Sequence, residues 1–510
     1  MKTTKMSLSR RRFNAVSFLA LAGATTEIGL STPAFAQALT PKSGGTLRIA
    51  RTEEIDGFKL DGEFSDETNE VSQNVIAPLL RFDSSGLRVV PGLAESFVVA
   101  ADGKSITFQL AKGARFNTGA PVTTDDVIFS VNQWKAGPNF GSMYVDIASV
   151  TKLSDTSFRF NLSAPNISLP AFLTWSVAGV IPNNFAGMKA DQFWLTPIGA
   201  GPFSVKSWEG SGNIHLVKNP YYYRPGLPYV DEILSTLPDE NQRALQFQSG
   251  EVDIVSELSP TEGRRYPKSK VIESEVHYTD VLLFNYQYKP LQDIRVRKAI
   301  AMAIDYDAIV VGLDHGQGIK PTGFLPPNVG MWQPPSKPYY RQNIAAAKAL
   351  LKEAGVTTMQ LELLFPPNYN LHSQIVQQNL QAIGIDVKLN PTDSGTFVSD
   401  ASAGKFQLAI WAYNAISPNI GDPLSWITST SYFFTNYPMN DLQAAANELF
   451  TSATPEAEKA AVIKIQDLGF SELAFLALDH FKIGTAVQSN IHGVAPPPWA
   501  NIYYDEIWIS

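Results

Sequence analysis

A helix that ends at glycine and is followed by a strand recurs in the second half of the chain, and this pattern constrains the fold most strongly. Residues 241–249 are predicted to be helical, Gly250 suits the position after the helix end, and Val252–Val255 is predicted to be a strand. Residues 373–384 repeat the helix with its terminal glycine and lead into the strand Ile385–Leu389. Alternating helices and strands predict an α/β architecture with mixed sheets.

The first third of the chain is expected to be richer in strands. Gly45–Ala50 and Ile106–Leu110 alternate apolar and polar residues, as half-buried strands do. Thr123–Asp126 offers an N-cap residue and early acidic residues for a helix that follows. The chain has 510 residues. Because one hydrophobic core rarely grows that large, we expect roughly two or three domains.

The N-terminus has the three parts of a secretory signal. Three arginines precede Phe13, a weakly apolar stretch runs from Ala15 to Leu30, and Ala34–Ala36 matches an A-x-A cleavage site. The arginine pair followed after one residue by Phe13 resembles a twin-arginine signal, which is associated with export of folded proteins. Residues 1–36 are therefore predicted to be a signal peptide, and the mature chain to work in the periplasm. A basic amphipathic surface helix is the alternative.

Charge and cysteine content narrow the possible partners. The formal net charge is −8, and removal of residues 1–36, which carry five basic residues and one acidic residue, makes it about −12. An acidic chain is a poor partner for nucleic acid. The absence of cysteine excludes disulfides, thiolate metal sites, cysteine nucleophiles and a thiol-linked lipid anchor. We therefore expect an exported, soluble monomer without a lipid anchor.

Catalytic motifs are absent from the sequence. No G-x-S-x-G, G-x-x-x-x-G-K, G-x-G-x-x-G or H-E-x-x-H occurs. The histidines are scattered without the spacing of metal ligands: His215, His277, His315, His372, His480 and His492. The sequence predicts no catalytic residue, no metal site and no cofactor, and it favours a protein that is not an enzyme. A secreted enzyme whose catalytic residues converge from distant positions, and a metal-delivery protein, stay open as alternatives.

Aromatic residues crowd one segment near residues 411–437. Trp411 ends a predicted strand, Phe406–Trp411, and the crowded segment follows it. Ligands of open α/β sheets bind at the carboxyl ends of strands, and aromatic side chains suit a binding cleft. Trp411 and the following loop are therefore the predicted ligand site. The alternative for most of these rings is that they fill a domain core.

Ordered sequence blocks along nearly the whole mature chain resemble the extracellular solute-binding proteins of family 5, the peptide and nickel type. The blocks are Pro91–Phe97, Ala101–Phe108, Gly113–Phe116, Val122–Val127, Gly199–Phe203, Lys218–Tyr222, Gly250–Ile254, Phe284–Asn285, Asp293–Ile300 and Ala303–Asp305. The resemblance implies a two-lobed periplasmic-binding-protein-like fold, type II and of the large peptide-binding class, with mixed sheets and a hinge. It also implies the ABC permease subunits of an inner-membrane importer as partners.

The resemblance also implies a division of the chain. Lobe 1 would comprise residues 37–284 with an inserted subdomain at about 71–196, and lobe 2 would comprise residues 285–478. Residues 479–510 would return to lobe 1, so Asp479 and His480 lie at the return crossover. The two lobes would close on the ligand.

The expected ligand is a peptide or a peptide-like small solute. Peptide-binding relatives have Trp-x-x-Asp at the loop, where the Asp holds the peptide ammonium; this sequence has Trp411, Ala412, Tyr413 and Asn414. Asn414 carries no charge, so Asp422 is a candidate replacement, with a turn before proline as its alternative role. The departure leaves an opine, an oligosaccharide or a modified peptide open. The predicted ligand-binding residues are Trp411, Tyr413, Asn414, Asp422, Asp479 and His480.

Overall fold

The computed structural model describes residues 40–510 except for gaps at 56, 61–65, 85, 87, 138–139, 167, 211, 275–276, 314–317, 328–331, 415–435, 453 and 496–501. Pro41–Ser510 forms one compact unit. The predicted signal peptide and Asp422 lie outside the described residues. No helix within the described ranges is long and apolar enough to cross a bilayer.

A seven-stranded mixed sheet contains the first and some of the last strands of the unit. Its order is β12-β18-β11-β1-β10-β9-β8. The bounds are β1 (Thr46–Ala50), β8 (Phe203–Trp208), β9 (Ile214–Lys218), β10 (Glu232–Thr236), β11 (Ile254–Leu258), β12 (Val271–Glu273) and β18 (Gly484–Val487). β1 pairs in parallel with β10 and β11, whereas β9 and β18 pair antiparallel with their neighbours. The predicted strand at residues 45–50 is confirmed.

A smaller antiparallel sheet follows in the first third, as the sequence predicts. Its order is β4-β5-β7-β6, with β4 (Ala94–Val99), β5 (Ser105–Leu110), β6 (Ile147–Lys152) and β7 (Ser157–Leu162). The two-stranded pairs are β2 (Leu80–Phe82) with β3 (Val89–Pro91) and β19 (Ile491–His492) with β20 (Trp508–Ile509). One hydrophobic core joins this sheet to the seven-stranded sheet, since Phe108 and Ile49 belong to the same cluster.

The predicted cap of the next helix is confirmed. Helix α2 (Thr124–Ala136) follows Thr123, whose backbone N–H and hydroxyl both donate to the Asp126 carboxylate, at 2.7 and 2.8 Å. The other helices associated with this part of the chain are short: α1 (Asp66–Gln73), α3 (Leu169–Phe172), α4 (Ala190–Phe193), α5 (Glu240–Ser249) and α6 (Pro260–Gly263). Gly250 ends α5 with φ of 77°, a conformation that glycine adopts without strain, as the sequence predicts.

A five-stranded mixed sheet contains the strands that matter for the site. Its order is β15-β14-β16-β13-β17, with β13 (Tyr278–Phe284), β14 (Met359–Phe365), β15 (Ile385–Pro391), β16 (Leu408–Asn414) and β17 (Phe475–Phe481). β13 lies between β16 and β17 and is antiparallel to both. β14 is parallel to β15 and β16.

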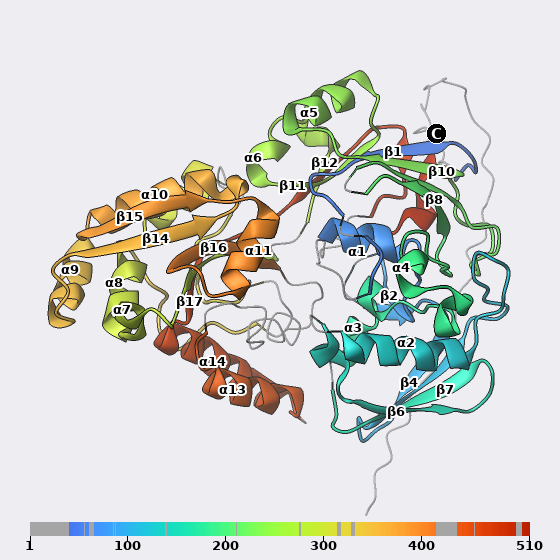
Figure 1. Ribbon diagram of the computed structural model, residues 1–510, viewed down its shortest axis with the longest axis horizontal. Helices are drawn as coiled ribbons and strands as arrows, with labels where there is room; N and C mark the ends of the chain where they lie inside the picture. Colours follow the sequence, from blue (N-terminus) through green and yellow to red (C-terminus); the bar gives the residue numbers. More distant parts are fainter. Residues whose placement is uncertain are drawn as a thin grey trace, which may run out of the picture. The chain divides into compact units, whose positions relative to one another are not determined.

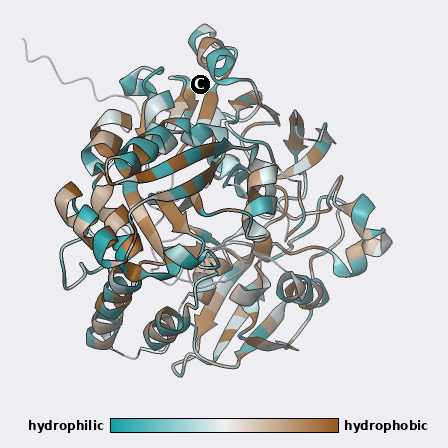
Figure 2. Cartoon of the chain, turned by 60° about the vertical axis from the view of Figure 1, so that its left-hand side comes forward, coloured by the Kyte–Doolittle hydropathy of each residue, from teal (hydrophilic) through white to brown (hydrophobic). Residues whose placement is uncertain are grey.

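Helices cover both faces of this sheet. One face packs with α8 (Ile294–Ala303), α9 (Ile344–Glu353) and α10 (Asn370–Gln381), and the other with α11 (Ser394–Ser402), α13 (Asn440–Phe450) and α14 (Pro455–Glu472). The short α7 (Lys289–Gln292) precedes α8. Leu282 packs on the first face and Val281 on the second, because side chains alternate along β13. Figures 1 and 2 show these helices around apolar strands.

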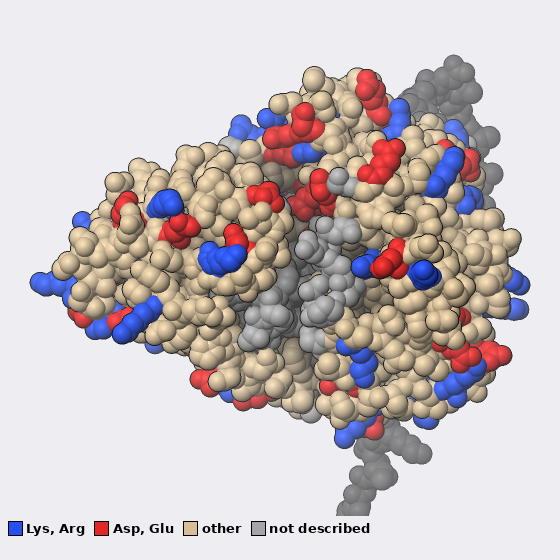
Figure 3. Space-filling view, viewed as in Figure 1, with Lys and Arg blue, Asp and Glu red and all other residues tan. Residues whose placement is uncertain are grey.

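The chain crosses between the two large sheets twice. It leaves the seven-stranded sheet after β12 and enters the five-stranded sheet at β13, and it returns from β17 to β18. Both crossovers lie close to the ends of β13 and β17. The division into lobes at residues 284–285 and 478–479 stays a prediction. On the face in Figure 3, Lys and Arg side chains are scattered among Asp and Glu.

Candidate ligand-binding site

Three adjacent strands bring the predicted site residues into two neighbouring rows. In one row Thr279 of β13 is paired with Tyr413 and His480. In the next, Asp280 is paired with Ala412 and Asp479. Successive residues of a strand face opposite sides of the sheet, so the two rows lie on opposite faces. The predicted residues therefore gather at one end of the β16-β13-β17 ladder without sharing a face.

A β-bulge in β17 places Asp479 opposite Asp280. Val281 pairs with Ala477, whereas Asp280 pairs with Asp479, so Leu478 is the extra residue. Without the bulge Leu478 would face Asp280. Bulges that redirect one side chain are common next to functional sites.

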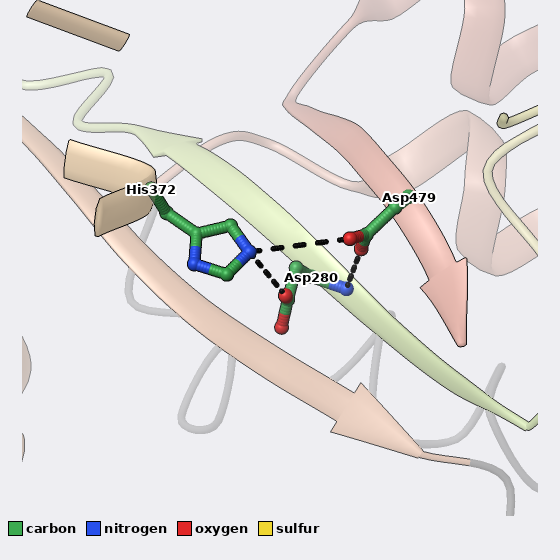
Figure 4. A group of neighbouring side chains, drawn as sticks. All are labelled: Asp280, His372 and Asp479. Atoms are coloured by element: carbon green, nitrogen blue, oxygen red, sulfur yellow. Dashed lines mark hydrogen bonds and ion pairs between the residues drawn. The ribbon is translucent and has the colours of Figure 1, made fainter. Parts of the chain in front are cut away.

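Asp280, His372 and Asp479 form a compact cluster on the face covered by α10 (Figure 4). The His372 Nε2 atom lies 3.2 Å from Asp280 Oδ2 and 4.0 Å from Asp479 Oδ2. The second oxygen of each carboxylate has a donor of its own. The Tyr369 hydroxyl donates to Asp280 Oδ1 at 3.0 Å, and the Asp280 backbone N–H donates to Asp479 Oδ1 at 3.3 Å.

The local sequence explains how His372 reaches this cluster. Tyr369 ends the short turn Pro367–Tyr369, and α10 begins directly after it, three residues earlier than the predicted start at Ser373. Residues three apart on a helical turn lie on one side, so Tyr369 and His372 both contact Asp280. Burial and the charges of Asp280 and Asp479 raise the pKa of Tyr369 well above its ordinary value, so its hydroxyl stays a donor.

The two carboxylates of this cluster lie close enough to repel each other when both are charged. Asp280 and Asp479 are both buried, and their ligand oxygens lie within 4.8 Å of each other and of the imidazole. At an effective dielectric constant of about 20, two full charges at that separation repel by roughly 3 kcal/mol. Within the described residues Asp280 forms an ion pair with His372 and with no Lys or Arg. The cluster can therefore accept positive charge.

Trp411 and Tyr413 lie on the opposite face, in the core covered by α11 and α14. Trp411 stacks on Phe397 with ring centroids 4.7 Å apart, and it is half-buried. Tyr413 is buried, and its hydroxyl donates to the Phe324 carbonyl. The prediction that the strand ends at Trp411 is wrong. β16 continues to Asn414 because its ladder with β13 continues to the Tyr278–Asn414 pair.

His480 is a buried core histidine whose ring already has a protein partner. Its Nδ1 lies 2.8 Å from the Thr279 hydroxyl, and its backbone forms two hydrogen bonds with Ile319. Burial lowers the pKa of His480 to about 3 and keeps the ring neutral. Its role in ligand binding stays a prediction, as do those of the other five residues.

Acidic side chains gather around Tyr278, the register partner of Asn414. The Tyr278 hydroxyl donates to the Asp66 carboxylate. Burial, followed by the charges of Asp66, Glu257 and Glu53, raises the pKa of Tyr278 well above its ordinary value. Burial, followed by the charges of Asp66, Glu67 and Glu53, raises the pKa of Glu257. Its φ of 53° is a strained conformation for a residue other than glycine. We call Glu53, Asp66 and Glu257 the Tyr278 acidic group.

The comparison with protein families decides the class. A family model described as bacterial extracellular solute-binding proteins, family 5 Middle, matches residues 88–434. The chain belongs to this family. The members of family 5 are solute-binding proteins, which confirms the predictions of a solute-binding protein and of a chain that is not an enzyme.

Curated relatives of this family 5 protein cover most of it. It is 28% identical over 382 residues to the dipeptide-binding protein of Escherichia coli K12, spanning 68% of this chain and 70% of that protein. It is 25% identical over 474 residues to the dipeptide-binding protein of Pseudomonas aeruginosa PAO1, spanning 84% and 88% of the two chains.

Solved structures confirm the predicted two-lobed α/β fold. The dipeptide-binding protein of Pseudoalteromonas sp. SM9913 in complex with Met-Leu has a TM-score of 0.84 at 20% identity, over 91% of this chain and 100% of that one. The periplasmic binding protein AgaA of A. tumefaciens R10, in complex with agropinic acid, has a TM-score of 0.83 at 23% identity, over 91% and 99%.

Sequence reasoning missed two of the three cluster residues in this family 5 protein. It named Asp479 for its place near the return crossover, but it treated His372 as one of six scattered histidines and did not name Asp280. The three residues are far apart in the sequence. A β-bulge aligns Asp479 with Asp280, and no local sequence pattern predicts that bulge. The one available signal was that Asp280 directly precedes the apolar run Val281–Phe284.

Proposed function

We propose that this family 5 protein is the periplasmic solute-binding component of an ABC importer and that its solute is a peptide or a peptide-like small molecule. The curated relatives described above are named dipeptide-binding proteins, which supports this solute class. The twin-arginine-like segment at residues 1–36 supports export, and the lack of cysteine supports a mature protein without a lipid anchor. The solute would be delivered to the permease subunits in the inner membrane.

The observation that carries the proposal is the pairing of Asn414 on β16 with Tyr278, around which acidic side chains gather. The sequence lacks the carboxylate that peptide-binding relatives have at the position of Asn414. Asn414 is paired with Tyr278, and the Tyr278 acidic group lies around that residue. Carboxylates there supply the negative charge that a peptide ammonium needs, since a buried ammonium requires a charged partner. Asp66 therefore takes the place of the missing aspartate in this proposal. The pKa of Glu257 is raised by burial, so Glu257 would add its charge only once an ammonium is bound beside it.

A second candidate is an opine-type solute without a free ammonium. The uncharged Asn414 favours it, since an amide both donates and accepts hydrogen bonds but does not balance a positive charge. The fold likeness to a protein in complex with agropinic acid is compatible with this candidate. An oligosaccharide is compatible with the same amide.

Mass spectrometry of the retained solute tests the proposal. The protein is purified without a tag from its native compartment, denatured, and the released small molecules are identified. We expect di- or oligopeptides or their derivatives with a free amino group. Recovery of an opine or a sugar would replace the first candidate with the second. A protein that releases no solute and binds none from a peptide and opine panel would contradict both.

A further inference from the structure

We propose that Asp280, His372 and Asp479 form a binding site for a divalent first-row transition-metal ion such as Zn²⁺. The inference goes beyond solute capture and does not depend on which solute is bound. It concerns a site on the α10 face of the five-stranded sheet, whereas Trp411 packs on the opposite face.

One separation between the ligand atoms equals those around a metal ion, and the others are longer by about an ångström or less. Zn–N and Zn–O bonds of about 2.0–2.2 Å place neighbouring ligand atoms about 2.8–3.6 Å apart. His372 Nε2 lies 3.2 Å from Asp280 Oδ2 and 4.0 Å from Asp479 Oδ2, and all three ligand atoms lie within 4.8 Å of one another. Small side-chain rotations bring the longer separations into this range.

The site is built in advance of any ion. Tyr369 holds one oxygen of Asp280 and the Asp280 backbone N–H holds one oxygen of Asp479, so the remaining oxygens are directed at the imidazole. Such hydrogen bonds orient metal ligands and increase affinity. The bulge in β17 is a second, independent feature, because without it Leu478 would occupy the position opposite Asp280. The backbone is therefore arranged to bring two carboxylates together, against their mutual repulsion.

The donor set indicates which ions fit. One imidazole and two carboxylates suit Zn²⁺, Co²⁺, Ni²⁺ or Mn²⁺ better than Ca²⁺, which prefers six to eight oxygen ligands. Three protein ligands leave at least one coordination position open. The His372 side chain is 14% exposed, whereas those of both aspartates are nearly inaccessible, so an ion reaches the site from the His372 side.

Metal titration of the untagged mature chain, residues 37–510, tests the site. After treatment with a chelator, Co²⁺ binding is followed by its visible absorption and Zn²⁺ binding by calorimetry. We expect one ion per chain in the wild type. His372→Asn and Asp479→Asn should each weaken binding by about 100-fold or more, since each removes one of three ligands. Circular dichroism confirms that the variants are folded.

His215→Asn is the matched control, because His215 also lies 3.2 Å from a carboxylate, that of Glu232. Among the described residues, His215 belongs to no group of three side chains that could hold a metal ion. It should bind Co²⁺ like the wild type. Absence of saturable Co²⁺ or Zn²⁺ binding would overturn the proposal and leave the cluster as a buried histidine–aspartate ion pair. Binding that survives His372→Asn would overturn it as well. Neither result would alter the identity of the solute recovered by mass spectrometry.

Discussion

Two buried carboxylates, Asp505 and Asp479, lie in opposite electrostatic environments. Both are almost inaccessible, at 1% and 0% relative exposure. Asp505 accepts hydrogen bonds from Arg81 at 2.9 and 3.3 Å, from Arg224, and from the Tyr222 hydroxyl at 2.9 Å. Asp479 instead faces a second carboxylate and an imidazole 4.0 Å away.

The different surroundings indicate that Asp505 has a structural role and Asp479 a role in binding. Burial alone would raise the pKa of Asp505, but the charges of Arg81 and Arg224 lower it below the ordinary value. Asp505 is thus fully compensated and joins three distant chain segments. The Asp280–His372–Asp479 cluster instead brings two carboxylates to one imidazole, an arrangement of ligand atoms that suits a cation. Substitutions that remove one negative charge should therefore have opposite effects at the two places.

The largest effect is expected for Asp505→Asn. It removes the carboxylate that pairs with Arg81 and leaves Arg224 with Glu506 alone, and breaking a buried pair in this way costs about 3–5 kcal/mol of unfolding free energy. Urea unfolding followed by circular dichroism measures it. Glu448→Gln is the control, because its ion pair with Lys464 is exposed and should change stability by less than about 1 kcal/mol. Equal losses of unfolding free energy in the two variants would contradict the claim that the buried ion pairs of Asp505 stabilise the fold.

Glu70→Gln extends the comparison to a third buried carboxylate, which forms no ion pair with a guanidinium group among the described residues. Burial and the nearby charges of Glu67 and Asp66 raise the pKa of Glu70 to about 8, and its Oε1 accepts from Tyr504 at 2.6 Å. A raised folded-state pKa contributes stability that is fully present below the unfolded value near 4.5 and is lost as pH rises toward about 8. Glutamine does not ionise, so the Glu70→Gln variant does not lose this stability as the pH rises.

We therefore expect Glu70→Gln to match the wild type near pH 5 and to exceed its unfolding free energy by about 2–4 kcal/mol near pH 8. Urea unfolding at several pH values measures the difference. An advantage that does not grow with pH would show that Glu70 is ionised in the folded protein. Burial raises the pKa of Glu67 as well, but Glu67→Gln should be less stable than Glu70→Gln, because both Glu67 carboxylate oxygens accept from backbone N–H groups, of Thr52 and Glu53, and glutamine has one oxygen.

The smallest effect is expected for Asp479→Asn in metal-free protein. One aspartate then remains opposite His372, so the repulsion is relieved, and the asparagine oxygen still accepts from the Asp280 N–H. We expect no loss and a gain of up to about 2 kcal/mol in unfolding free energy. A loss as large as that of Asp505→Asn would mean that Asp479 is already compensated, which would break the comparison.

Much of the fold could be predicted because its signals are local. The helix cap at Thr123, the glycine end at Gly250 and the alternation in β1 depend on neighbouring residues, and each is confirmed. The end of β16 was misplaced by three residues, since pairing with β13 rather than local propensity determines it. The Asp280–His372–Asp479 cluster depends on strand register, a bulge and a helix start, none of which a single sequence displays. Asp422 lies outside the described residues.

Calorimetry of the recovered solute tests most directly the claim that the end of β16 binds it. Trp411→Ala is compared with Trp194→Ala, since both tryptophans are half-buried and contact a phenylalanine ring. The account predicts that Trp411→Ala weakens solute binding by about tenfold or more, as loss of a stacked ring at a binding site does, while Trp194→Ala binds like the wild type. Unchanged affinity in Trp411→Ala would contradict a solute site at this end of the sheet.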